Sequence, residues 1–136
     1  MDENVKNTDI TIDTDEVERF SSLANSWWDP EGDFRPLHQI NPIRLKFIRD
    51  HLCNHFALDP NQPPSLRGLS ILDVGCGGGL ISEPLTRMGA SVTGIDAAEI
   101  NISIAQSHAE AGNLNINYQP LSIETLSKRN LAFDVV

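Results

Sequence analysis

The residues with the clearest chemical potential form a glycine-rich segment in the middle of the chain. Residues 73–79 read Asp-Val-Gly-Cys-Gly-Gly-Gly, where a short apolar run meets a stretch of helical character. Glycines at such a junction let the backbone turn sharply and approach a ligand closely. The start of the following helix offers free N–H groups and a partial positive charge. The segment therefore indicates a nucleotide-type ligand, with a tight strand–helix turn that binds nothing as the alternative.

The spacing of the glycines distinguishes between two kinds of nucleotide site. A dinucleotide site needs G-x-G-x-x-G, but its third glycine would fall on Leu80 or on Ser82. What the segment contains is an acidic residue followed by glycines at every second position: Asp73, Gly75, Gly77 and Gly79.

This acidic-x-Gly-x-Gly-x-Gly pattern resembles the first motif of class I S-adenosylmethionine-dependent methyltransferases. The resemblance implies a donor with a cationic amine and a sulfonium, which the Asp73 carboxylate can organise directly or through water. A diphosphate would be repelled by the same carboxylate, so an NAD(P) dehydrogenase is disfavoured. We predict S-adenosyl-L-methionine as the cofactor, bound by Asp73 and by Gly75, Gly77 and Gly79.

A second acidic residue supports this interpretation. Asp96 directly follows the apolar run Val92–Ile95, the next strand candidate after the glycine-rich segment. At the tip of a second strand, its carboxylate can accept hydrogen bonds from the 2′- and 3′-hydroxyls of a ribose. The alternative role, a cap for the helix that follows, is compatible with ligand binding.

The N-terminal third carries a more specific resemblance. Residues 20–45 include Trp-Trp-Asp at 27–29 and Asn-Pro-Ile-Arg at 41–44, and this run is similar to the signature of the ubiquinone biosynthesis O-methyltransferases. Leu72–Gly79 and Val92–Asp96 are similar to the same family. The resemblance covers about residues 15–136 of the chain.

The resemblance implies O-methylation of phenolic hydroxyls on polyprenylated intermediates of ubiquinone biosynthesis. Matched by position, Arg44, Gly75 and Asp96 correspond to cofactor-binding residues of the family. Arg44 lies off the apolar stripe of its helix, and a guanidinium can bind the donor's carboxylate bidentately; a plain surface arginine is the alternative.

The family also includes members that need Mg²⁺ or Zn²⁺, but the sequence shows no His/Asp/Glu cluster with ligand spacing, and no metal ligand is predicted. The catalytic residues are expected after residue 136.

The family also suggests partners and a location. These are a polyprenylated phenol or catechol substrate, a ubiquinone-biosynthesis complex and the cytoplasm, with peripheral contact to the inner membrane through residues outside this chain. Two other functions stay open at this point. One is a methyltransferase for another small molecule, and the other is a truncated, non-catalytic donor-binding or interaction protein.

Three further side chains are interpreted as structural. Trp27 and Trp28 are expected to anchor a helix to the core, with a lid over the donor or a wall for the acceptor ring as the alternative. His38 is expected to make a loop hydrogen bond rather than to act as a base.

Length and charge limit the function classes. The 136 residues carry a formal net charge of −9, which disfavours binding to nucleic acid or to anionic lipid through basic residues. No run reaches the roughly 18 apolar residues of a membrane span. Two cysteines are too few for a disulfide scaffold, which favours a reducing compartment.

Hydrophobic periodicity predicts two helices and then alternating strands and helices. The first helix begins near Asp15 and ends before Pro30, and the second begins at Asn41-Pro42 after an irregular loop over 29–39. Strands over 69–74, 91–96 and 115–119 alternate with helices over 80–88, 98–111 and 123–128, and a fourth strand starts at 133. This order predicts an α/β fold with a parallel, Rossmann-like methyltransferase sheet.

The domain prediction has three parts: a disordered acidic tail over 1–14, a helical cap and linker over 15–68, and the N-terminal half of the donor-binding α/β domain over 69–136. The chain looks cut off within its fourth strand, so we expect this chain alone to be inactive.

Overall fold

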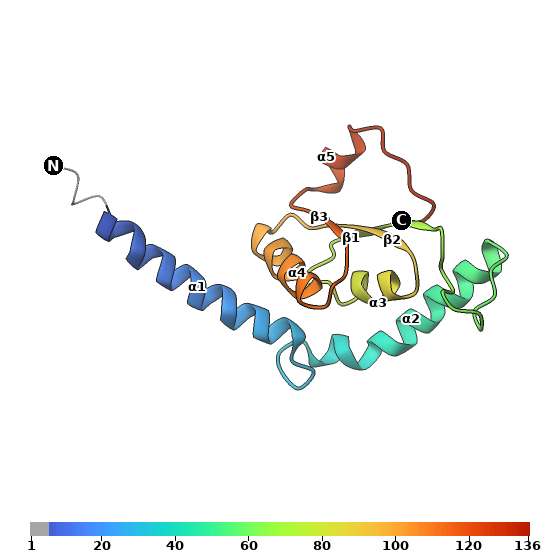
Figure 1. Ribbon diagram of the computed structural model, residues 1–136, viewed down its shortest axis with the longest axis horizontal. Helices are drawn as coiled ribbons and strands as arrows, with labels where there is room; N and C mark the ends of the chain where they lie inside the picture. Colours follow the sequence, from blue (N-terminus) through green and yellow to red (C-terminus); the bar gives the residue numbers. More distant parts are fainter. Residues whose placement is uncertain (1–5) are drawn as a thin grey trace.

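Two long helices precede the sheet. The computed structural model describes the backbone of residues 6–136 and the side chains of residues 15–136. Helix α1 (Lys6–Trp28) extends away from the body of the molecule, whereas α2 (Arg35–His55) lies along that body (Figure 1). The two are joined by a short turn in which Gly32 and Arg35 donate to the carbonyls of Asp29 and Gly32.

The prediction of a disordered tail over residues 1–14 is wrong for residues 6–14, which belong to α1. Extending an existing helix is much easier than starting one, so the helix anchored by residues 15–28 continues toward the N-terminus. Residues 1–5 lie outside the described residues. The C-terminal end of α1 at Trp28 agrees with the prediction.

Helix α2 begins earlier than predicted, at Arg35 rather than Asn41. Pro36 occupies its first turn, where a missing N–H is tolerated because no intrahelical partner exists there. Pro42, which was predicted to open the helix, lies inside it. The loop predicted over 29–39 is correspondingly shorter.

The rest of the chain alternates as predicted. Strand β1 (Ser70–Val74), helix α3 (Ser82–Arg87) and strand β2 (Ser91–Ile95) are followed by α4 (Glu99–Ala111), β3 (Asn117–Gln119) and α5 (Ile123–Ser127). The predicted helix over 80–88 starts later, at Ser82, because Leu80 and Ile81 still belong to the glycine turn, and it ends one residue earlier, at Arg87, with Met88 as its C-cap.

The strands are parallel and ordered β1-β2-β3, with Ile71 opposite Val92 and Thr93 opposite Asn117. The predicted fourth strand is a single parallel bridge between Ile71 and Val135 on the free side of β1. Leu72 donates to the Val135 carbonyl at 2.9 Å, and Val135 donates to that of Ser70 at 3.1 Å. The C-terminal segment thus lies beside β1, so β1 and its glycine turn lie between this segment and β2.

Successive residues of β1 face opposite layers, as the strand period requires. Ile71 packs with Cys53, Leu66, Leu85 and Val92 beneath α2 and α3. Leu72 packs with Ile95 and Leu126 beneath α5, on the opposite face (Figure 1). The two layers hold the carboxyl ends of β1 and β2 side by side, where the predicted site residues lie.

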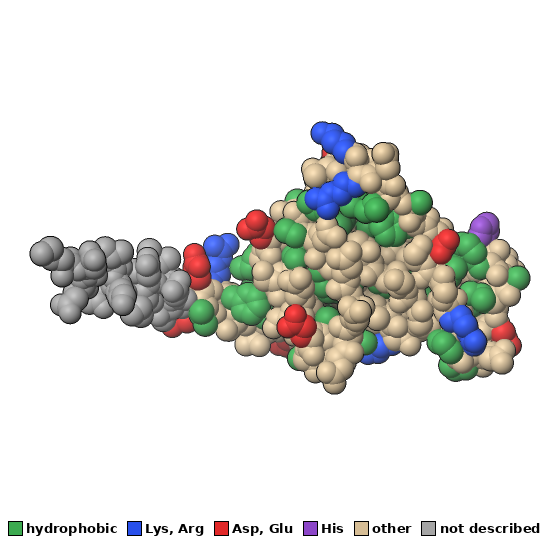
Figure 2. Space-filling view, turned by 45° about the horizontal axis from the view of Figure 1, so that its top comes forward, with side chains coloured by type: hydrophobic (Ala, Val, Ile, Leu, Met, Phe, Trp, Pro, Cys, Tyr) green, Lys and Arg blue, Asp and Glu red, His purple; other side chains and the backbone are tan. Residues whose placement is uncertain are grey.

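The surface carries mixed charge. On the face shown in Figure 2, Lys and Arg side chains are scattered among Asp and Glu without a broad area of one sign. Among the described residues, no helix is long and apolar enough to span a bilayer.

Candidate functional site

A small cavity lies where α2 meets the glycine turn that follows β1. Its volume is about 250 Å³, and its walls hold Trp27, Leu37, Arg44, Asp73, Val74, Gly75, Cys76, Gly77, Leu80 and Ile81. Four of the six predicted cofactor-binding residues therefore meet there: Arg44, Asp73, Gly75 and Gly77. Gly79 and Asp96 are not part of its wall.

Gly75 gives the cavity an open floor. Its φ of +73° lies in the left-handed region that favours glycine, and no other atom lies within 4 Å of the place a Cβ would take. The amides of Gly75 and Cys76 donate to the Ile95 carbonyl at 2.8 and 3.0 Å, which ties the turn to the end of β2. The space beside Gly75 is thus open, and any other residue at this position would fill it with its side chain.

Asp73 supplies the negative charge of the cavity. Its Oδ2 accepts a hydrogen bond of 2.7 Å from Ser82, whose side chain is buried at the start of α3. Burial raises the pKa of Asp73 above its ordinary value, and the Ser82 hydrogen bond and the nearby Arg44 charge oppose that rise. The carboxylate is therefore a desolvated anion held in one orientation, ready to bind a cation.

Arg44 supplies the positive charge. It lies on the exposed side of α2, as its position off the apolar stripe predicts, and it lines the cavity together with Asp73. A cavity with an anionic and a cationic group fits a zwitterion such as an amino acid moiety. The volume, just below the roughly 300–1,000 Å³ usual for ligand pockets, suits part of a nucleoside donor rather than all of it.

Asp96 acts on the protein itself. Its Oδ2 accepts from the Gly77 amide at 3.0 Å, and its Oδ1 accepts from the Ala98 amide at 2.9 Å. The carboxylate therefore joins the glycine turn to the segment before α4, but it is not the helix cap: the N-cap residue of α4 is Ala98, and no side chain makes a cap hydrogen bond there. An ionised carboxylate has about four acceptor positions, so these bonds leave capacity for a ribose.

Gly79 serves packing. A Cβ there would lie 2.5 Å from the hydroxyl oxygen of Tyr118, and its φ is +99°. Tyr118 is buried against α4, and its hydroxyl has no hydrogen-bond partner among the described residues. The third glycine of the pattern is thus explained by β3 rather than by the cavity.

Trp27 is a cavity residue that the sequence interpretation placed in the core. A Cβ on Gly77 or Gly78 would come within 2.5 or 2.8 Å of its indole ring. The other partner of the ring is Phe34, stacked at 3.9 Å between centroids. The fit of the indole against these glycines gave no direct signal in the sequence, because Trp27 and Gly77 lie far apart along the chain.

The interpretations of His38 and Trp28 agree with the structure. His38 Nε2 lies 2.9 Å from the Trp27 carbonyl oxygen, so this ring makes a structural hydrogen bond as expected, although the bond joins α2 to α1 rather than lying within a loop. Trp28 anchors α1 by donating from Nε1 to the Gly78 carbonyl at 3.1 Å. Asn41 adds a bond of 2.8 Å from its side-chain amide to the Leu80 carbonyl.

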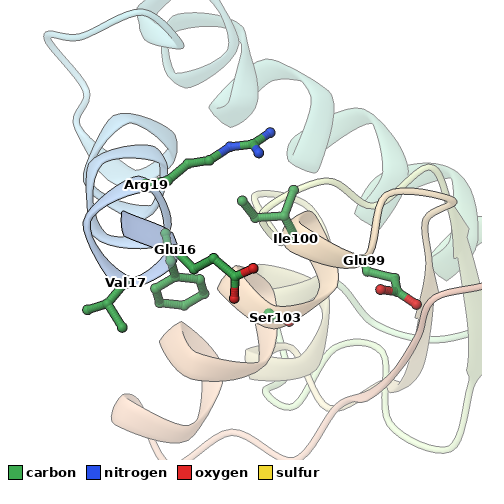
Figure 3. A pocket seen from close by; sticks show the side chains of 7 residues that line it. Glu16, Val17, Arg19, Glu99, Ile100 and Ser103 are labelled. Carbon is green, nitrogen blue, oxygen red and sulfur yellow. The ribbon is translucent and has the colours of Figure 1, made fainter. Parts of the chain in front are cut away.

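A larger hollow of about 820 Å³ lies elsewhere, between α1 and α4. Glu16 and Arg19 extend into it from α1 and Ile100 from α4 (Figure 3). It contains none of the predicted site residues, so its size alone does not make it the site.

Cys53 and Cys76 are both buried and free, and burial raises the pKa of Cys76 to about 12. Within the described part of the chain, no three His, Cys, Asp or Glu side chains are grouped to hold a metal ion.

Residues 71–136 match the family model described as "Methyltransferase domain". The match starts in β1 and includes the cavity's glycine turn, so Asp73, Gly75 and Gly77 lie within the matched residues.

The predicted resemblance to ubiquinone biosynthesis O-methyltransferases is confirmed. One such protein from Sinorhizobium fredii is 53% identical over 126 residues, which are 93% of this chain and 51% of the relative. Another, from Mesorhizobium japonicum, is 51% identical over the same share of each. The chain spans about half the length of the curated relatives it matches.

Solved structures support the fold of the methyltransferase domain. A magnesium protoporphyrin IX methyltransferase from Synechocystis, with bound S-adenosylmethionine, superimposes with a TM-score of 0.58 at 22% identity, over 85% of this chain and 53% of that one. A 16S rRNA methyltransferase from T. thermophilus, in complex with the same donor and guanosine, superimposes with a TM-score of 0.58 at 25% identity. The match covers 70% of this chain and 24% of that one. The class I methyltransferase fold is therefore confirmed.

Proposed function

We propose that this chain binds S-adenosylmethionine in the cavity that Arg44, Asp73 and Gly75 line. The observation that carries the proposal is the meeting of an arginine, a half-buried aspartate and a glycine with open space beside it in one small cavity at the end of β1. A donor with an amino acid end, a sulfonium and a ribose needs these groups. The identity with methyltransferases over 93% of the chain supports the same ligand.

Each residue has a role that follows from its chemistry. Arg44 binds the donor's carboxylate through paired N–H groups, and Asp73 holds its cationic amine. Gly75 and Gly77 let the backbone approach the donor without a side chain between them. Asp96, already fixed by two backbone amides, accepts from the ribose. The bound donor supplies an electrophilic methyl group, and this chain binds and orients it.

The acceptor we propose is a phenolic hydroxyl of a polyprenylated intermediate in ubiquinone biosynthesis. The relatives' names support this assignment, as does the specific N-terminal run over residues 20–45. A transferase of this kind must hold the acceptor oxygen behind the methyl carbon and remove its proton. We expect the relatives' other half to supply those groups, so that this chain alone binds donor without turnover.

Location and partners follow from the same family. We propose a place in the cytoplasm beside the inner membrane, where a polyprenylated substrate resides, and a role within a ubiquinone-biosynthesis complex. The overall negative charge argues against attachment to anionic lipid through this part of the chain.

A labelling experiment with S-adenosylmethionine carrying a radioactive methyl group tests the proposal. Equilibrium dialysis of the donor against the chain should show saturable binding, and addition of a polyprenylated catechol should give no labelled product. Absence of saturable binding would contradict the donor site. Labelled product above the background without protein would contradict the division of roles between the two halves.

A further inference from the structure

A ring of contacts outside the cavity connects the end of α1 with the glycine turn. Trp28 donates to the Gly78 carbonyl at 3.1 Å. One face of this indole stacks on the imidazole of His108 in α4, with the two rings parallel within 1° at a centroid distance of 3.6 Å. The position of Trp28 on the turn thus depends on a histidine that lies far beyond both of them along the chain.

Glu83 fixes the orientation of His108. Its Oε2 lies 2.6 Å from His108 Nδ1 and its Oε1 lies 3.2 Å from Arg87. The Glu83 side chain is completely buried, with 0% of its area exposed, whereas 39% of the His108 side chain is exposed.

The ring closes on the turn itself. The backbone N–H of Glu83 donates to the Gly79 carbonyl at 3.1 Å. The contacts therefore run from Gly78 through Trp28, His108 and Glu83 back to Gly79, the next residue along the chain. A fully buried carboxylate is rare unless it is paired. Here the imidazole paired with Glu83 and the indole stacked on that imidazole belong to the same closed series of contacts.

We infer that Glu83 and His108 are positioning residues for the glycine turn and that they act through Trp28. Neither residue lines the cavity. Glu83 sets the imidazole plane, the imidazole holds the indole flat, and the indole N–H holds the Gly78 peptide in the orientation that keeps the turn open at Gly75. The inference rests on the proposed function, since the turn is the proposed donor site.

Two variants break this series of contacts at different places. His108→Gln keeps a hydrogen-bond donor for Glu83 and removes the imidazole that Trp28 stacks on. Trp28→Phe keeps an aromatic ring on His108 and removes the N–H that reaches Gly78. His51→Gln is the matched control, because His51 also lies against an aromatic ring, Phe47, but on the exposed side of α2.

The readout is amide hydrogen exchange of the full chain without ligand. His108→Gln and Trp28→Phe should each speed exchange over residues 75–83 by about tenfold, with β1 and β2 unchanged, and the double variant should go no further because both changes break one series of contacts. The His51 control should match the wild type. If His108→Gln unfolds the chain, Glu83→Gln takes its place in the same comparison.

Three results would overturn the inference: unchanged exchange over 75–83 in His108→Gln, effects that multiply in the double variant, or a rise in exchange rate spread equally over β1 and β2.

Binding of S-adenosylmethionine, measured on the same proteins, should weaken in the variants whose exchange over 75–83 becomes faster. If the wild type binds no donor while the exchange pattern holds, the proposed function fails and the positioning role stands. If the donor binds but the exchange pattern is absent, the reverse is true.

Discussion

Trp27 lies directly against Gly78, so closely that a Cβ on residue 78 would come within 2.8 Å of the indole Cγ and Cδ2. The pair joins the last turn of α1 to the turn after β1, two segments that are distant in the sequence. The sequence pattern explains the glycines by the approach of a ligand, but at this position the approaching group is a side chain of the protein.

Gly78→Ala should therefore destabilise the fold by roughly 1–3 kcal/mol, the usual effect of overpacking. In a Trp27→Ala background the same substitution should cost less than about 0.5 kcal/mol, because the φ of residue 78 suits alanine and the clash is gone. Urea unfolding of the four proteins measures both. Gly75→Ala is the control: its strain arises from φ +73° rather than from Trp27, so Trp27→Ala should not relieve it. Equal losses for Gly78→Ala in both backgrounds would show that Trp27 does not constrain residue 78.

Arg44→Ala should weaken binding of S-adenosylmethionine. A hydrogen bond to a charged group contributes about 1.5–3 kcal/mol, which corresponds to roughly 10- to 100-fold in Kd. Arg35→Ala is the matched control, since Arg35 is an exposed arginine of the same helix that faces Glu31 at 3.9 Å. Titration calorimetry that gives Arg44→Ala the same Kd as Arg35→Ala would remove Arg44 from the donor site.

Asp73→Asn should separate stability from binding. Burial raises the pKa of Asp73 above 3.8, so the folded state binds this proton more tightly than the unfolded state. Its contribution to stability is present at pH values below 3.8 and is lost as the pH rises through the raised pKa. The amide keeps an acceptor for Ser82 without the charge. The free energy of unfolding of the variant, relative to that of wild type, should therefore increase as the pH rises from 3.5 to 7. Its affinity for the donor at pH 7 should fall by roughly tenfold.

Urea unfolding of both proteins at the two pH values, followed by calorimetry at pH 7, measures these changes. A wild-type advantage in stability that grows toward pH 7 would mean that Asp73 is a stabilised rather than a desolvated anion. An unchanged affinity would exclude the amine as its ligand.

Much of the fold could be predicted because local patterns determine it. Short apolar runs such as Leu69–Val74, each followed by a helical stretch, leave little choice but a parallel sheet, and Asp73 and Asp96 then fall at neighbouring strand ends. The start of α2 could not be predicted in the same way. Both Pro36 and Pro42 are suitable for a first turn, so residue type alone does not tell which of them begins the helix; in the structure Pro36 lies in the first turn and Pro42 inside the helix.

The site was predictable to the extent that residue type determines the role. Arg44, Asp73, Gly75 and Gly77 meet in one cavity because the turn and α2 both follow from the sequence. Gly79 has the same residue type, but its small size is required by Tyr118. The burial of Glu83 depends on His108 in the next helix, a contact that periodicity does not reveal.

Cys76 should be unreactive in the folded chain although it lies in the cavity wall. Burial and the neighbouring Asp73 and Asp96 raise its pKa to about 12, and only the thiolate is an effective nucleophile. Ellman's reagent at pH 8 should label neither this thiol nor the buried Cys53 until urea unfolds the protein. Rapid labelling of one thiol before unfolding, mapped to Cys76 by mass spectrometry, would contradict the burial of the turn.

The most direct test of the donor site is a backbone NMR titration of this small chain with S-adenosylmethionine. The largest amide shifts should appear at Gly75 and Gly77, with smaller ones at Arg44 and Asp96, and NAD⁺ at the same concentration should produce none of them. Shifts that gather instead around Glu16 and Ser103, in the hollow between α1 and α4, or an absence of shifts with S-adenosylmethionine, would contradict a donor site at the glycine turn.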